Sequence, residues 1–170
     1  MGYRRARALS RIVAASLLGA VVAALVQSNA NLEADSRTKD FRLGRAERCF
    51  MRKINARRAR AGRPRLRWDG QLVYVGRRHA RSLARAGRGV WHDPQLGRKV
   101  TRWRSLGENT ARGGTCRAVM RALWRSPPHR ANILGRWSFV GVGVARRHGR
   151  IYVQQIFETR SDPGNIYSHP

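Results

Sequence analysis

The residues best suited to chemistry gather in one stretch of the chain, residues 107–134, with the sequence GENTARGGTCRAVMRALWRSPPHRANIL. It contains a carboxylate at Glu108, a neighbouring amide at Asn109 and an imidazole at His129. Carboxylate and imidazole side chains transfer protons and bind metal ions, whereas the rest of the chain offers mainly arginine and small apolar residues. We therefore expect any chemistry of this protein to pass through this stretch.

Two local elements are expected to position the histidines. Residues 87–105 are punctuated by glycine and proline and are predicted to form an irregular loop that carries His92. Ser126 is predicted to cap a short helix that has Pro127 as its first residue, which puts His129 in the first turn. Because a helix N-terminus disfavours the imidazolium ion, His129 is expected to be neutral and free to accept a proton or a metal ion.

The hydrophobic pattern predicts helices followed by a hairpin. Apolar residues at helical spacing mark a first helix that begins near Asp40 and ends before Gly62. A second helix is predicted from an N-cap at Asp69, and a third from an N-cap at Thr115. Strict alternation predicts a strand over residues 139–145, which turns and returns as a partner strand at 151–157.

Two features of these elements carry further expectations. His79 lies on the inward stripe of the second helix, where a hydrogen-bonded core histidine is the more common outcome than a ligand. Gly141 and Gly143 leave one face of the first hairpin strand without side chains, which leaves room for something to lie close there.

Residues 1–30 have the pattern of a secretory signal peptide. Four arginines accompany an apolar run, and Ser28-Asn29-Ala30 supplies the small residues of a cleavage site. The run is shorter than the about 20 apolar residues that a bilayer span needs, and an uncleaved membrane anchor is the alternative. We expect a secreted, extracellular protein, with association with the cell envelope as an option.

The two cysteines, Cys49 and Cys116, fall on two separate predicted helices. In an oxidising compartment such a pair is more often a disulfide than a metal site, so we expect a Cys49–Cys116 disulfide. Two free buried thiols are the alternative. The chain contains no CxxC motif, and thiol redox catalysis is therefore not supported.

The formal net charge of +27 is far outside the range of ordinary globular domains. Such a field attracts polyanions: nucleic acid, anionic lipid or an anionic cell-wall polymer. Sequence-specific nucleic-acid motifs are absent and export argues against a chromosomal target, so we expect no specific nucleic acid partner. A solvated basic surface with no single partner is the alternative.

Taken in order, these pieces resemble the CAP superfamily of cysteine-rich secretory proteins, antigen 5 and plant pathogenesis-related proteins, and its short bacterial SCP-like branch in particular. The ordered set of landmarks is more specific than any one of them. The landmarks are Ile54-Asn55-x-x-Arg58, Leu66-x-Trp68-Asp69, Ala80, Trp91-His92, Gly107-Glu108-Asn109, Trp124-x-Ser126-Pro127-x-His129-Arg130-x-Asn132-Ile133-Leu134, Gly141-Val142-Gly143-Val144 and Tyr152-Val153-Gln154.

The resemblance implies an α+β fold, a three-layer α-β-α sandwich with a small antiparallel sheet and a cleft. It places the CAP domain at residues 45–158, between a lead-in at 31–44 and a tail at 159–170. In many members the cleft holds two histidines and two acids that bind a divalent metal. His92, Glu108 and His129 match three of these four, whereas Pro127 stands where the second acid is expected.

His92, Glu108 and His129 form a set that is chemically sufficient for zinc with one open position, with Asn109 and Ser126 in supporting places. The competing interpretation is that these side chains only hydrogen-bond loops together. No cofactor is certain, and a divalent metal such as zinc is the candidate. Nucleophilic catalysis is not favoured, because Ser126 is expected to cap a helix and both cysteines to form a bridge.

We favour a monomeric, non-enzymatic protein that binds a lipid or an anionic cell-envelope polymer through a His/Glu cleft and an arginine-rich surface. The alternative is a metal-dependent hydrolase that uses His92, Glu108 and His129.

Overall fold

The computed structural model describes residues 42–160. The predicted signal peptide, nearly all of the lead-in and most of the tail lie outside the described residues. Contacts divide the chain into Met1–Arg42 and Leu43–Pro170, and the second unit contains every element considered below. Among the helices of residues 42–160, none has the length and apolar character needed to cross a membrane.

A four-stranded sheet forms the middle of the domain. Its strands are β1 (Arg67–Trp68), β2 (Trp103–Gly113), β3 (Phe139–Arg147) and β4 (Arg150–Arg160), and their spatial order is β1-β3-β4-β2. The pair β3–β4 is antiparallel, as predicted, and β4–β2 is antiparallel as well, whereas the two residues of β1 pair parallel to β3. The sheet is therefore mixed, which corrects the expectation of a purely antiparallel one.

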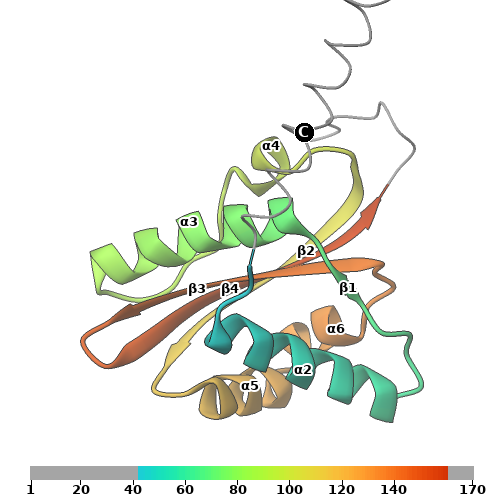
Figure 1. Ribbon diagram of the computed structural model, residues 1–170, viewed down its shortest axis with the longest axis horizontal. Helices are drawn as coiled ribbons and strands as arrows, with labels where there is room; N and C mark the ends of the chain where they lie inside the picture. Colours follow the sequence, from blue (N-terminus) through green and yellow to red (C-terminus); the bar gives the residue numbers. More distant parts are fainter. Residues whose placement is uncertain (1–41, 161–170) are drawn as a thin grey trace, which may run out of the picture. The chain divides into compact units, whose positions relative to one another are not determined.

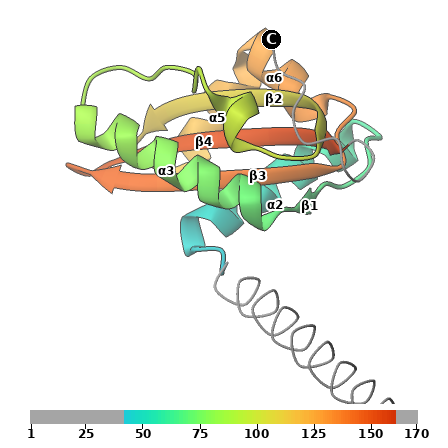
Figure 2. The ribbon, with the colours of Figure 1, turned by 90° about the horizontal axis from the view of Figure 1, so that it is seen from above.

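Helices cover both faces of this sheet, which confirms the three-layer α-β-α fold (Figure 1). The helices α3 (Gly70–Ala86) and α4 (Leu96–Lys99) lie on one face. The helices α2 (Arg45–Arg60), α5 (Cys116–Arg125) and α6 (Pro127–Leu134) lie on the other, and Figure 2 shows α3 running across β3 and β4. Each helix buries its apolar stripe against the sheet, which is the physical reason for the layered arrangement.

The backbone of α3 lies directly on β3, at the two strand glycines. A Cβ atom at Gly141 would overlap Leu72, and one at Gly143 would overlap the backbone of Gly76 and Arg77. The empty face of the strand is thus filled by a helix. On the opposite face, Val140 and Val142 are fully buried in the main core.

Three predicted helix ends are confirmed by their capping bonds. The Asp69 carboxylate accepts a hydrogen bond from Leu72 N at 3.1 Å, and Thr115 Oγ1 accepts one from Ala118 N at 3.1 Å. Gly87 ends α3 in the left-handed conformation, with φ of 70°.

The sequence missed β2 and α4, both within or next to the stretch predicted to be irregular. The strand β2 shows no alternation of apolar and polar residues, because Asn109 and Thr110 are both buried and face opposite sides. Its partners on β4, Gln155 and Gln154, are polar and buried as well. A period of two is invisible where both faces of a strand carry buried polar side chains.

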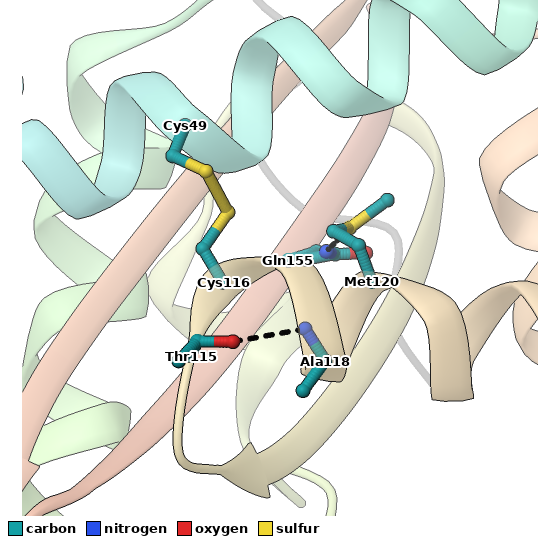
Figure 3. The surroundings of a disulfide bond; sticks show 6 residues. All are labelled: Cys49, Thr115, Cys116, Ala118, Met120 and Gln155. Atoms are coloured by element: carbon teal, nitrogen blue, oxygen red, sulfur yellow. Dashed lines mark hydrogen bonds between the residues drawn. A yellow bond between two sulfur atoms is a disulfide. The ribbon is translucent and has the colours of Figure 1, made fainter.

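The disulfide between Cys49 and Cys116 is present, as predicted, and joins α2 to the first residue of α5 (Figure 3). The two Cα atoms are 6.4 Å apart and 67 residues separate the cysteines in the sequence. On the loop-entropy account, a crosslink of this span stabilises the fold by about 4 kcal/mol.

Candidate functional site

The carboxylate of Glu108 is the centre of the candidate site. It lies on β2, and its side chain is only 9% exposed. It is 2.8 Å from His92 Nδ1, and it accepts from the backbone N of Asp93 at 3.1 Å and from Gln154 Nε2. Three partners therefore occupy the oxygens of this nearly buried carboxylate, as buried polar groups require.

This arrangement fixes the tautomer of His92. Because a carboxylate only accepts hydrogen bonds, the proton of a neutral His92 lies on Nδ1 and its Nε2 is left as an acceptor. The His92 side chain is 64% exposed, so this Nε2 faces solvent. The pair is thus an oriented imidazole whose second nitrogen is available for a proton or a metal ion.

Asn109, the next residue of β2, points to the opposite face and has a structural role. Its Nδ2 donates to His129 O at 3.1 Å and to Gln155 Oε1 at 3.1 Å. Its Oδ1 accepts from Asn132 Nδ2 at 2.9 Å, and Asn132 also donates to Glu108 O at 2.8 Å. This fully buried amide therefore fastens α6 to the edge strand β2.

His129 lies in the first turn of α6, and burial lowers its pKa, with a smaller lowering from the nearby charge of His92. The neutral state agrees with the prediction, although desolvation rather than the helix N-terminus is the leading cause.

Ser126 occupies the N-cap position of α6 with Pro127 as the first helical residue, as predicted, but its side chain makes no capping hydrogen bond. A capping hydroxyl accepts from the backbone N–H of the second or third helical residue. Here the second residue is Pro128, which has no N–H. The Ser126 hydroxyl instead lies 2.7 Å from Nδ1 of His129, at the third helical position.

The three predicted ligands do not form a ready-made metal triad. Within residues 42–160, no group of three or more His, Cys, Asp or Glu side chains is placed to hold a metal ion. Glu108 is engaged behind His92, in the manner of a carboxylate that orients a metal-binding imidazole. If the protein binds a divalent metal, His92 would be its first ligand, through Nε2, with His129 as the second candidate; metal binding stays a prediction.

Sequence reasoning missed Asp93 and Gln154 as members of this site. Asp93 is 6% exposed, and its carboxylate accepts from Lys99 Nζ at 2.7 Å and 2.6 Å. The buried His79 donates from Nε2 to the carbonyl oxygen of Trp91 at 2.8 Å, and its Nδ1 lies 3.9 Å from an Asp93 carboxylate oxygen. These contacts hold the loop that carries His92, and they confirm His79 as a hydrogen-bonded core residue.

Residues 42–160 contain three cavities whose linings do not include His92, Glu108 or His129. One of about 570 Å³ is lined by Asp93 and the residues of α4. One of about 670 Å³ lies between α2 and β1, and one of about 300 Å³ lies between α2 and α5. The cleft that the resemblance implies is not among these three.

A sequence model of the cysteine-rich secretory protein family, CAP, matches residues 51–157. Among solved structures, venom allergen-like protein 4 of Schistosoma mansoni aligns with a TM-score of 0.55 at 13% identity, over 75% of this chain and 97% of that chain. An outer surface protein of Borrelia burgdorferi aligns with a TM-score of 0.61 at 17% identity, over 67% of this chain and 92% of that chain.

An extracellular protein of Bacillus anthracis that contains an SCP domain aligns with a TM-score of 0.57 at 25% identity. The alignment covers 67% of this chain and 41% of the Bacillus protein, so it concerns less than half of that protein's length. No curated protein matches the chain by sequence.

Proposed function

The chain belongs to the cysteine-rich secretory protein family, and from this premise we propose that it is an extracellular, non-enzymatic domain that binds an anionic lipid or an anionic polymer of the cell envelope. The proposal rests on the distribution of charge in the domain rather than on the fold alone, because one fold serves many functions.

The observation that carries the proposal is that every carboxylate of residues 42–160 is withdrawn from the surface. All five acidic side chains of this region are buried or half-buried, and these are Glu47, Asp69, Asp93, Glu108 and Glu158. Glu47 binds Arg77, Asp93 binds Lys99 and Glu108 binds His92. Within residues 42–160 no acidic side chain is classed as exposed, whereas many arginines are, so the exposed charge of this region is predominantly positive.

Such a surface favours polyanions of any kind at long range. Arginine adds selectivity at short range, because its guanidinium group forms paired hydrogen bonds with phosphate and carboxylate groups. Anionic lipid headgroups and anionic envelope polymers both present such groups at high density. They are also the polyanions that an exported protein meets first.

Three features support an extracellular location. The N-terminal residues have the pattern of a signal peptide, and the disulfide is of a kind that persists in oxidising compartments. Two of the structural relatives are described as an extracellular protein and an outer surface protein.

Cosedimentation tests the binding function directly. We expect the purified protein to bind vesicles that contain phosphatidylglycerol, or isolated cell-wall material, and not vesicles of phosphatidylcholine alone. Binding should fall as salt is raised from about 0.05 M to 0.5 M, because screening shortens the range of the interaction. Binding that depends neither on salt nor on lipid charge would refute the proposal.

A metal-dependent hydrolase is the second candidate, favoured by the His92–Glu108 pair and the neutral His129. A divalent metal held there would supply an activated water molecule. The test is the metal content of protein purified without chelators, with His92→Ala as the variant. The hydrolase candidate requires bound metal that this variant loses, together with a hydrolytic activity that disappears with it.

A further inference from the structure

A groove of about 670 Å³ between α2 and β1 combines an apolar lining with a dense positive charge. Its apolar lining includes Met51, Leu66, Trp68 and Phe139. Met51 and Leu66 belong to the main core, and Trp68 is 45% exposed. A volume of this order is typical of sites that hold small organic ligands.

Among residues 42–160, four arginines and no acidic residue line the same groove. They are Arg48, Arg52, Arg65 and Arg67, all exposed. Two acids adjoin lining residues in the sequence: Glu47 is 4% exposed and is bound to Arg77, and the half-buried Asp69 accepts a hydrogen bond from Leu72 N at the start of α3. The guanidinium of Arg67 is stacked over the Phe139 ring at 4.7 Å, which positions one charge directly beside the apolar lining.

The walls of the groove are held rigidly. The side chain of Asn55 on α2 donates to Leu66 O at 3.1 Å and accepts from Leu66 N at 2.9 Å. Arg58 is 1% exposed and donates to Pro64 O at 2.8 Å and to Ile133 O at 2.9 Å. A preformed site loses less conformational entropy when a ligand binds.

The groove and the His92–Glu108 pair lie at opposite edges of the sheet. The strand order β1-β3-β4-β2 puts β1, which lines the groove, at one edge and β2, which carries Glu108, at the other. A ligand in the groove is therefore independent of the histidine site.

We propose that this groove binds an anionic amphiphile, with a phosphate head held by the arginines and a single alkyl chain lying on Trp68, Leu66 and Met51. A polyanion without an alkyl chain would contact only the arginines of the groove, and a neutral lipid would contact only its apolar lining. This inference rests on the proposed binding of anionic envelope ligands, and it names the site and the ligand class.

The test is titration of the full chain with monododecyl phosphate below its micelle concentration, followed by calorimetry and tryptophan fluorescence. The comparison ligands are dodecyl maltoside, which has the same chain on a neutral head, and inorganic phosphate. We expect binding of the alkyl phosphate to be at least about tenfold tighter than that of either comparison ligand.

Two double variants separate the groove from the general charge of the protein. Arg65→Gln with Arg67→Gln should weaken alkyl phosphate binding by about tenfold or more, since charge-assisted contacts are lost. Arg81→Gln with Arg85→Gln removes the same charge from exposed positions on α3 and should change the affinity by less than about twofold. Equal losses in the two variants would overturn the groove as the site.

Trp68→Phe gives a second readout that does not depend on charge. It keeps an aromatic ring in the groove but removes the indole, so the fluorescence change should disappear while calorimetric affinity is largely kept. An unaltered fluorescence change would place the ligand elsewhere and overturn the proposal.

Vesicles that contain phosphatidic acid distinguish a membrane source of the head group from a free amphiphile. If anionic vesicles bind wild type and the Arg65/Arg67 variant equally, the proposed function stands and the groove is wrong. If neither anionic vesicles nor alkyl phosphate bind, both proposals fail.

Discussion

Glu108 and Asn109 are neighbours on β2 that serve the two faces of the sheet. The Glu108 carboxylate lies 2.8 Å from His92 Nδ1, whereas the Asn109 amide nitrogen donates to the backbone oxygen of His129 at 3.1 Å. The alternation of a β-strand thus separates the side chain that orients an imidazole from the one that fastens α6. The candidate site depends on both, because the two histidines reach the edge of β2 from different elements.

Asn109→Ala should destabilise the whole domain. The side chain is fully buried, and its loss removes the donor to the buried Gln155 Oε1 together with the hydrogen bonds to Asn132 Nδ2 and His129 O. We expect a loss of about 3 kcal/mol in the free energy of unfolding, measured by urea denaturation. A loss below about 0.5 kcal/mol would show that water replaces the amide at no cost.

The outcome for α6 shows where sequence reasoning fails at the site. The pattern Ser126-Pro127 correctly predicted the start of a helix, and His92 with Glu108 correctly marked a pair that meets in space. What Ser126 binds could not be predicted, because it depends on a missing N–H at Pro128 and on the rotamer of His129. Asp93 and Gln154 were missed because their roles arise only when a loop and β4 meet Glu108.

A similar limit holds for the fold. Hairpin alternation and capping residues predicted β3, β4 and the starts of α3 and α5, because these signals are local. The two-residue strand β1 owes its existence to parallel pairing with β3, and β2 owes its existence to pairing along β4. The residues of β1 and β2 themselves carry no pattern that indicates this pairing.

Ser126→Ala and Thr115→Ala should differ although both residues occupy N-cap positions. Thr115 accepts from Ala118 N at 3.1 Å, and its replacement should cost about 1 kcal/mol. Ser126 makes no side-chain capping bond and instead bonds His129 Nδ1, so the cost of its replacement should largely disappear in a His129→Ala background, whereas the cost of Thr115→Ala should be unchanged there. An equal cost of Ser126→Ala in both backgrounds, measured by urea denaturation, would contradict the assignment of the Ser126 hydroxyl to His129.

Replacement of both Cys49 and Cys116 by serine should lower the free energy of unfolding by about 4 kcal/mol, because the unfolded chain regains the freedom of a long loop. Denaturation of wild type with and without reductant gives the same comparison without mutation. The reduced wild type and the double variant should agree, and a thiol titration of the oxidised, denatured protein should find no free cysteine.

Gly143→Ala should be among the most damaging single substitutions in the domain. The added Cβ would overlap the backbone of Gly76, and a backbone cannot move aside as a side chain does. We expect a loss of about 3 kcal/mol or failure to fold. Gly114→Ala is the matched control, since a Cβ there meets nothing within 4 Å, and it should remain close to wild type.

His129 should make the stability of the domain depend on pH. Burial, together with the charge of His92, lowers its pKa in the folded state, so the unfolded chain binds the proton more tightly. Stability should therefore rise with pH across the window between this lowered pKa and the unfolded value of about 6.5, and level off above it. Below this pH window, His129 is protonated in both the folded and the unfolded state, and the full free-energy cost of burying its imidazolium is present.

The measurement is the free energy of unfolding of wild type and His129→Gln between about pH 5 and 8. Acidic residues and the other histidines contribute to both proteins, so the difference between the two curves isolates His129. We expect wild type to lose more stability than the variant as the pH falls below about 6.5. Parallel curves would mean that His129 has the same pKa in the folded and unfolded states. This result would contradict the claim that folding lowers its pKa and keeps it neutral.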